Sequence, residues 1–239
     1  MFLKDFITGI LSEPAPKEDF IKPPSQGIRR LFDVVRRDFL KIVLLNLLFL
    51  LFCIPVFTIP AAVTAMSKVT MTMFKNPCYY LWEEFISSFK KEFWKATLAG
   101  ILYYGAISLV LVAFKVYENM ALNTPLLYIA VAFSAVCLLL LIFSGFYLFP
   151  MIANLNISLF ASIKNSVSLA VLCPLRNSVT LVSILVLCLV LENVLPMSLL
   201  LVLLIVPAIF NLITTYCASK GIEKYQLGKI EIVSEKQGT

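Results

Sequence analysis

The stretch Asn46-Leu-Leu-Phe-Leu-Leu-Phe-Cys-Ile-Pro-Val-Phe-Thr-Ile-Pro-Ala-Ala-Val-Thr-Ala65 decides how this chain folds. Its first half is as apolar as a membrane helix, and Pro55 then interrupts it because proline cannot continue a helix interior. Pro60 stands where a proline opens a helix, and small residues follow it. Whether the chain returns across the membrane after Pro60 fixes the topology of everything downstream.

The composition predicts an all-α protein, a polytopic bundle of membrane helices. Hydrophobic residues make up 60% of the 239 residues, against roughly 45 to 50% in soluble domains. Several other runs are also apolar over the length of a membrane helix or nearly so. We therefore expect one membrane domain over residues 42–217, between a cytoplasmic segment 1–41 and a cytoplasmic tail 218–239.

Residues suited to catalysis or metal binding are scarce. The chain has no histidine, which is the commonest general base and metal ligand. Its six cysteines form no CxxC pair and are interpreted as small buried hydrophobic residues. No P-loop or glycine-rich dinucleotide turn occurs. We expect no enzyme activity, no cofactor and no metal site.

The N-terminal 41 residues divide into three parts. Residues 1–11 have an apolar helical stripe typical of a helix lying on a membrane surface. Four prolines make residues 12–26 a linker, and residues 27–41 form a basic juxtamembrane helix. The net charge of +6 comes largely from basic residues beside apolar runs, which favours contact with anionic lipid over nucleic acid.

The distribution of lysine and arginine predicts six crossings of the cell membrane with both termini in the cytoplasm. If residues 60–74 cross, the basic residues of the N-terminal segment, of 75–95, of 150–177 and of the tail all lie inside. The predicted membrane helices are 42–59, 60–74, 97–114, 126–149, 178–191 and 197–217. The second is the short one, since about 14 residues rise only about 21 Å against a core of ~30 Å.

A further helix is predicted between the second and third crossings, at residues 77–95. Its apolar face carries Trp82, Phe85, Phe89 and Phe93, and Lys90 belongs to the same segment. This pattern is typical of an amphipathic helix in the cytoplasmic interface. A docking face for a cytoplasmic partner is the alternative.

Lys68 is the one charge predicted to lie within the bilayer. With no carboxylate expected in reach, carbonyls near Pro55 or the amide of Asn46 are its expected partners. In a shallow second helix, Lys68 would instead extend to the interface. Nearby threonines would either line a cavity or bond their own helix backbone. The candidate binding residues are Asn46, Pro55, Thr58, Pro60, Thr64 and Lys68.

Two segments resemble the YesL family of Gram-positive bacterial membrane proteins, a family of unknown function. Asn46 to Ala65 is similar to its Asn-Leu-Leu-Trp-Leu-Leu-Cys-x-x-Pro motif and the proline turn that follows, and Ser88-Phe-Lys-Lys-Glu-Phe-Trp-Lys-Ala-Thr97 is similar to a second motif. The chain departs from the pattern at Phe49, where the family has tryptophan, and its turn lacks a glycine. The resemblance covers about residues 27–110. It implies a place near carbohydrate import, because family members often lie beside sugar-uptake genes.

Three functions are consistent with these observations. The first is an accessory or regulatory membrane protein beside a sugar ABC importer or another membrane protein. The second is a small-solute permease or facilitator with a cavity between the first and second helices. The third is a scaffold that organises the lipid bilayer. No nucleic-acid partner is expected.

Overall fold

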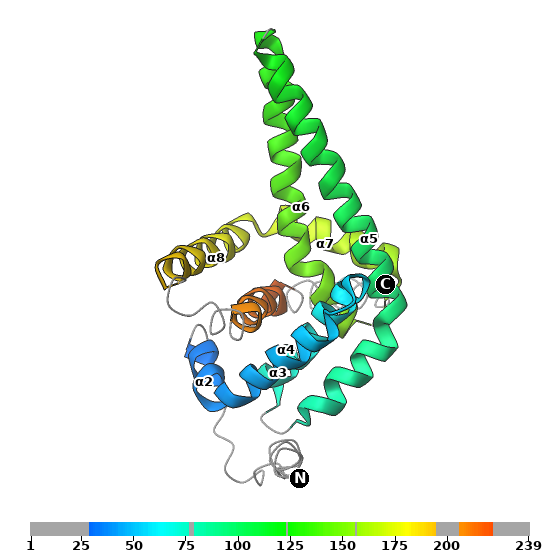
Figure 1. The fold of residues 1–239 in the computed structure, drawn as a ribbon, viewed down its shortest axis with the longest axis vertical. Coiled ribbons are helices and arrows are strands. Elements are labelled where there is room, and N and C mark those ends of the chain that lie inside the picture. Colours follow the sequence, from blue (N-terminus) through cyan, green and yellow to red (C-terminus); the bar gives the residue numbers. More distant parts are fainter. Residues whose placement is uncertain (1–28, 77–78, 123, 156, 195–205, 222–239) are drawn as a thin grey trace, which may run out of the picture.

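The computed structural model describes residues 29–76, 79–122, 124–155, 157–194 and 206–221, and nearly all of them are helical (Figure 1). No β-strand occurs among these residues, so the predicted all-α class is confirmed. The helices are α2 (Arg29–Arg37), α3 (Phe39–Phe52), α4 (Ile59–Lys75), α5 (Leu81–Ala121), α6 (Tyr128–Asn154), α7 (Leu159–Leu172), α8 (Pro174–Val194) and an unlabelled helix 206–221. Short 3₁₀ turns, η2 (Val56–Thr58) and η3 (Pro125–Leu127), precede α4 and α6.

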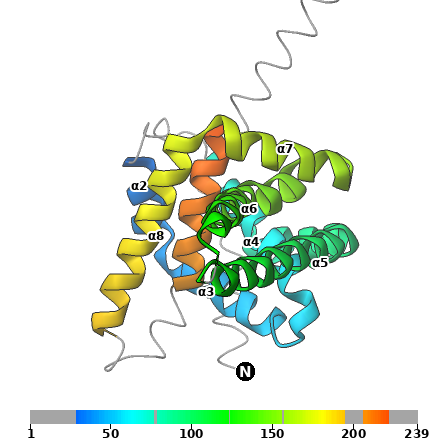
Figure 2. The same cartoon turned by 90° about the horizontal axis from the view of Figure 1, so that it is seen from above.

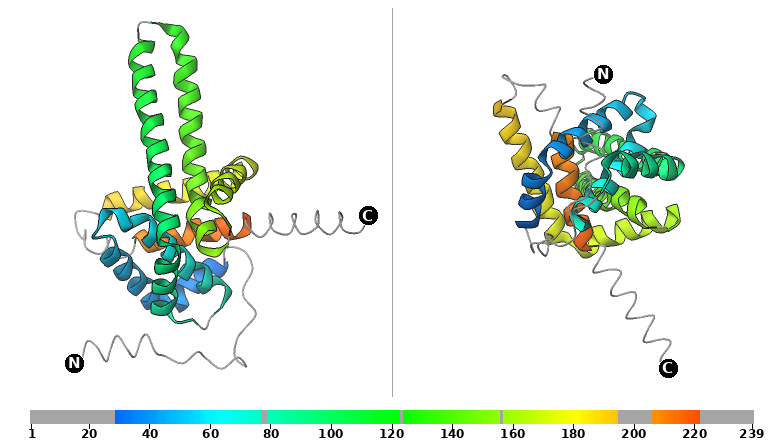
Figure 3. Two further views of the ribbon diagram at one scale, coloured as in Figure 1. Left: turned by 90° about the vertical axis from the view of Figure 1, so that its right-hand side faces the viewer. Right: turned by 90° about the horizontal axis from the view of Figure 1, so that it is seen from below.

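Helices α5 and α6 form a long antiparallel hairpin that projects from a base made by the other helices (Figures 1 and 3). In the view along the hairpin, α8 and the helix 206–221 both run across its direction (Figure 2). The base holds α4, which packs against α5, α6 and α3. The fold is therefore a packed base with an apolar hairpin standing on it.

Three segments within the described part of the chain are long and apolar enough to cross a membrane: Val56–Lys75, Leu81–Ala121 and Pro125–Asn154. A fourth arises if α7 and the start of α8, which are bent by 91° at their junction, count as one broken span. These helices confirm the predicted helical bundle. Residues 195–205, where the sixth predicted helix begins, lie outside the described residues.

The structure reverses the expected lengths of the first two helices. Val56–Lys75 has 20 residues and passes as a span, whereas α3 has 14 and falls short. The helix α3 ends at Phe52 because Pro55 prevents its continuation. The turn residues Val56–Thr58 then extend α4 at its start, so the short helix is the first and not the second.

The predicted interfacial helix and the third membrane helix are one continuous helix, α5, of 41 residues. The predicted break near residue 96 is absent because no proline interrupts the segment and Ala96 and Thr97 continue the helix. Similarly, Pro150 lies inside α6 and does not end it. The predicted helix boundaries near residue 96 and after residue 149 were therefore wrong.

Close packing of α4 depends on its small residues. Ala61, Ala62 and Ala65 are almost completely buried. On the facing helix, a Cβ added at Gly100 would lie 2.3 Å from Cγ of Pro60, so only glycine allows this approach. Gly105 lies about one and a half turns further along α5. A Cβ added there would have nothing within 4 Å.

Candidate functional site

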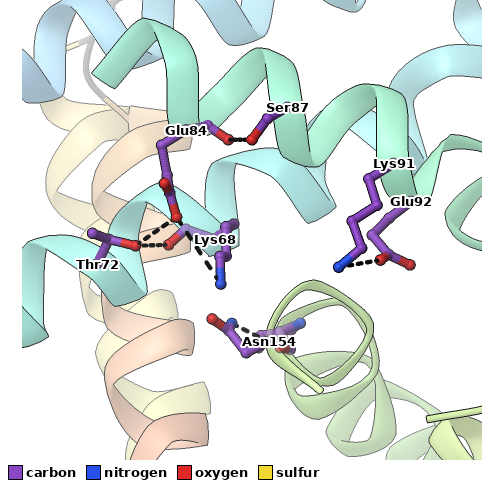
Figure 4. A network of polar contacts seen from close by, with 8 residues as sticks. Lys68, Thr72, Glu84, Ser87, Lys91, Glu92 and Asn154 are labelled. Carbon is purple, nitrogen blue, oxygen red and sulfur yellow. Dashed lines mark hydrogen bonds and ion pairs between the residues drawn. The ribbon is translucent and has the colours of Figure 1, made fainter. Parts of the chain in front are cut away.

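The polar site of this structure lies between α4 and the start of α5 and centres on Lys68. Its ammonium Nζ is 4.0 Å from Oε1 of Glu84. The Thr72 hydroxyl donates to the same carboxylate oxygen at 3.1 Å and also contacts the Lys68 carbonyl at 3.1 Å. Figure 4 shows this arrangement, with Asn154 at the end of α6 facing the lysine. A lysine, a carboxylate and a hydroxyl therefore meet where three helices converge.

The expected partners of Lys68 were wrong. We expected no carboxylate in reach and predicted carbonyls near Pro55 or the Asn46 amide as partners, but the structure pairs Lys68 with Glu84. Glu84 lies in the segment 77–95, which we predicted to be a separate amphipathic helix. Because that segment is the start of α5 and packs along α4, its polar face points at Lys68 instead.

This ion pair opens into a polar pocket of about 440 Å³. The side chains of Lys68 and Glu84 are 34% and 32% exposed, so both remain accessible. The other lining residues are Met71, Thr72, Lys75, Asn76, Tyr79, Tyr80, Glu83 and Asn154. The pocket carries two lysines and two glutamates, and it is suited to binding a polar or charged group of a partner.

A second charged cluster fixes the basic helix α2 to the end of α4. Asp38 is buried, and Nη2 of Arg37 lies 2.7 Å from its carboxylate while donating to the Met73 carbonyl at 3.2 Å. Lys41 lies 4.0 Å from the other carboxylate oxygen and over the Tyr79 ring at 4.9 Å. Burial, and then the charge of Asp38, raises the pKa of Tyr79 above its ordinary value, so its phenol stays neutral.

The remaining predicted binding residues serve the turn and the helix packing. Asn46 is fully buried in α3, and Pro55 lies in the exposed turn. The Thr58 hydroxyl donates to the carbonyls of Phe52 and Pro55, and the Thr64 hydroxyl donates to the Pro60 carbonyl at 2.8 Å. Thr64 therefore bonds its own helix backbone, as one of the two alternatives predicted, whereas Thr58 bonds residues that precede α4.

The structure has a second pocket, which differs from the cavity predicted between the first two helices. An apolar cavity of about 410 Å³ is lined by α4, α5, α6 and the helix 206–221, and α3 contributes only Phe49. None of the six candidate binding residues lines it. Its walls come mostly from the hairpin and the helix 206–221, which are distant in sequence, and the cavity between the first two helices stays a prediction.

One wall of the apolar cavity carries a buried amide network that the sequence analysis missed. Asn211 accepts hydrogen bonds from Thr70 and Thr215, each at 3.2 Å, and donates to the Ser67 hydroxyl at 3.0 Å. The network joins α4 to the helix 206–221. The signal that could have revealed it is an asparagine in a predicted membrane helix facing a serine and threonine stripe on another.

The predicted interfacial stripe packs mainly inside the protein. Phe85 is fully buried, and the ring centroids of Phe89 and Phe52 are 4.8 Å apart. Phe93 continues this row, 5.4 Å from Phe89. Trp82 and Lys90 are exposed. The aromatic face of this segment therefore covers the end of α3, and only its edge is available to lipid or a partner.

The described residues contain no group of three or more His, Cys, Asp or Glu side chains that could hold a metal ion. Four cysteines in this part of the chain, Cys53, Cys137, Cys173 and Cys217, are free thiols. Among the described residues, the carboxylates that lie close to another charged side chain pair with lysine or arginine.

Comparison with known proteins links part of the chain to an uncharacterised family. The model of DUF624, a protein family of unknown function, matches residues 42–114. This range begins in α3 and ends in α5, so it contains the proline turn, α4 and the Lys68 to Glu84 pair. No curated protein and no solved structure matches the chain.

Proposed function

We propose that the protein is a non-enzymatic accessory protein of the cell membrane, of the YesL type, that binds a cytoplasmic segment of a carbohydrate importer. The motif resemblance over residues 46–65 and 88–97, and the DUF624 match over residues 42–114, support the YesL assignment. The link to carbohydrate import rests on that resemblance. Both termini lie in the cytoplasm in this proposal.

The observation that carries the contact role is the accessible ion pair in the polar pocket. Lys68 and Glu84 lie beside Lys75 and Asn154, at the ends of α4 and α6. The lysine and arginine distribution predicts that these helix ends face the cytoplasm. A partially exposed, charge-balanced pocket on that side offers hydrogen bonds and ion pairs to a partner loop, and it can exchange its internal pair for external ones.

A solute facilitator is less well supported. The apolar cavity and the polar pocket share no lining residue, and α4 lies between them, with Ser67 on one side and Lys68 on the other. A route for a polar solute needs hydrogen-bonding groups along its length, whereas most of the cavity lining is apolar. The α4 helix therefore separates the two spaces.

The contact role is tested by photocrosslinking in cells that express both the protein and the sugar importer of the same organism. A photoreactive amino acid at Tyr80, which is 50% exposed and lines the pocket, should crosslink to the membrane subunit of the importer. Lys68→Leu should abolish this crosslink. The matched control is Lys115→Leu, which removes the lysine of another ion pair with a glutamate, at the far end of α5, and should change nothing.

Solute uptake into liposomes that contain only this protein would contradict the accessory role, particularly if Lys68→Leu abolished that uptake. Loss of the Tyr80 crosslink in both lysine variants would show a general defect and no specific contact. An unchanged crosslink in Lys68→Leu would remove the polar pocket from the proposal.

The proposed topology is tested with single cysteines in a background without the six native ones. Phe57 lies in the turn before α4 and is 65% exposed, and Asn76 follows α4 at its other end. A membrane-impermeant thiol reagent added to intact cells should label Phe57→Cys and leave Asn76→Cys unlabelled. Labelling of both positions would contradict a crossing by α4.

A further inference from the structure

The apolar cavity lies beside the part of the molecule that must face a membrane. Its walls come from α4, from the hairpin α5 and α6, and from the helix 206–221. Two lining residues, Tyr104 and Phe210, are also 48% and 40% exposed, so they form its rim. The cavity therefore opens onto the outer surface next to the hairpin.

The lining selects an apolar occupant. Phe146, Phe149, Ile107 and Ile142 are among the hydrocarbon and aromatic side chains that surround the space. The polar groups on one wall are already engaged, because the Asn211 amide bonds Thr70, Thr215 and Ser67. A polar ligand would have to leave water without new hydrogen bonds, which is costly.

The cavity is too large to be a packing defect. At about 410 Å³ it is well over twice the volume of an engineered cavity of about 150 Å³ that binds benzene. Empty apolar space of this size is costly, because the lining atoms lose their contacts. Filling by hydrocarbon restores these contacts.

The surrounding side chains keep the space open. The Tyr103 hydroxyl donates to the Leu141 carbonyl at 3.1 Å, and its ring packs edge-on against Phe149 with centroids 6.1 Å apart. Gly145 permits this placement, since a Cβ there would lie 2.2 Å from the Tyr103 oxygen. Tyr103 is thus held across α6 as a wall, and it does not collapse into the cavity.

We propose that this cavity holds a hydrocarbon chain of a membrane lipid. The lateral opening beside the exposed apolar hairpin makes the bilayer the source of the occupant. An acyl chain in this space contacts the apolar side chains that line it from α4, the hairpin and the helix 206–221. This lipid site goes beyond the proposed contact role, and it lies on the opposite side of α4 from the polar pocket.

The test uses tryptophan fluorescence in vesicles of phosphatidylcholine whose acyl chains carry bromine, which quenches tryptophan on contact. Both native tryptophans, Trp82 and Trp94, are first replaced by phenylalanine. A single tryptophan is then placed in the cavity by Phe146→Trp. We expect its fluorescence to fall in brominated vesicles, relative to unbrominated ones, about as far as that of a lipid-facing tryptophan.

Two matched controls set the scale. Phe133→Trp replaces a residue of α6 that is 70% exposed and should be strongly quenched. Phe85→Trp replaces a residue that is fully buried among α3, α4 and α5 and does not line the cavity, so it should not be quenched. If Phe146→Trp fails to fold, Phe149→Trp gives the same comparison, because Phe149 also lines the cavity and is 6% exposed.

A cavity-filling substitution makes the assignment specific. Val63 lines the cavity from α4, and Val63→Phe should abolish quenching at position 146 while leaving that at position 133 unchanged. Quenching at 146 that resembles the buried control would overturn the proposal. So would quenching at 146 that persists in the Val63→Phe variant. Neither result depends on the importer contact, so the two proposals can fail separately.

Discussion

The helix α4 and the hairpin α5 and α6 contain all three described candidate spans, yet they are surrounded in opposite ways. The apolar window of α4 is 67% buried inside the protein, whereas those of α5 and α6 are each 11% buried. Mean hydropathy runs the other way, at 1.2 for the α4 segment and 2.0 and 2.9 for the hairpin segments. The least hydrophobic of these helices is the one enclosed by protein.

The less hydrophobic helix is the more buried one because the surroundings of a membrane helix are lipid and not water. Lipid chains are as apolar as leucine, so burial of large apolar side chains gives no advantage in a bilayer, and helices associate through small residues and hydrogen bonds. The Ala, Ser and Thr residues of α4 provide both. The hairpin instead exposes large side chains such as Leu109 and Phe133, which suit a hydrocarbon environment.

The largest expected effect comes from charging the hairpin surface. Leu109 is 71% exposed on α5, and Leu109→Lys should reduce membrane insertion, with an apparent cost of about 2.5 to 3.5 kcal/mol at a helix centre. Insertion assays in microsomes measure this cost. Leu109→Ala is the control and should insert nearly as well as the wild type. Normal insertion of Leu109→Lys would mean that this surface does not face hydrocarbon.

The next effect concerns the contact between α4 and α5. Gly100→Ala would place a Cβ 2.3 Å from Pro60 and should destabilise the fold by about 1 to 3 kcal/mol. Gly105→Ala meets nothing within 4 Å and should be neutral or stabilising, since alanine favours helices. Thermal unfolding in detergent compares the two. Equal stability of the two variants would show that α5 does not approach α4 at Pro60.

A smaller effect is expected from the buried amide network. Asn211→Leu removes three hydrogen bonds and should lower the free energy of unfolding by roughly 1 kcal/mol. Hydrogen bonds between membrane helices have measured energies of this size. The cost stays modest because Ser67 and Thr70 keep bonds to their own helix backbone. Ser134→Ala, which loses only a bond to its own helix, should be nearly neutral. A stabilised Asn211→Leu protein would contradict a role in joining the helices.

The smallest effect on stability is expected at the polar pocket. Glu84→Gln weakens an ion pair whose two side chains are about one-third exposed. The free energy of unfolding should therefore change by less than about 1 kcal/mol. The same variant should lose the Tyr80 crosslink to the importer. If Glu84→Gln strongly destabilised the fold and left the crosslink unchanged, the ion pair would stabilise the protein without contacting the importer.

The sequence predicted the fold class and the helix after Pro60, because proline position and apolar length are local signals. It could not reveal that the segment 77–95 continues into the next helix, since the amphipathic pattern of a surface helix and of a helix packed on one side is the same. The aromatic rings of Phe85 and Phe89 show this ambiguity, because they face α3 and not lipid.

For the candidate site, the sequence identified Lys68 and missed its partner. Sequence spacing relates residues within one helix, whereas Glu84 meets Lys68 through the packing of two helices. Asn211 was missed for the same reason, since two of its three partners, Ser67 and Thr70, lie on α4, more than a hundred residues earlier in the chain. Contacts between helices are set by tertiary packing, which periodicity does not report.

The central claim, that α4 is enclosed by protein while the hairpin faces lipid, is tested most directly by spin labels on single cysteines at Met73 and Leu109 in reconstituted vesicles. Met73 is 1% exposed in α4 and does not line the apolar cavity. The label at Leu109 should collide often with oxygen and rarely with a water-soluble nickel chelate, and the label at Met73 should collide little with either. Equal oxygen access at both positions, or strong nickel access at Leu109, would contradict the account.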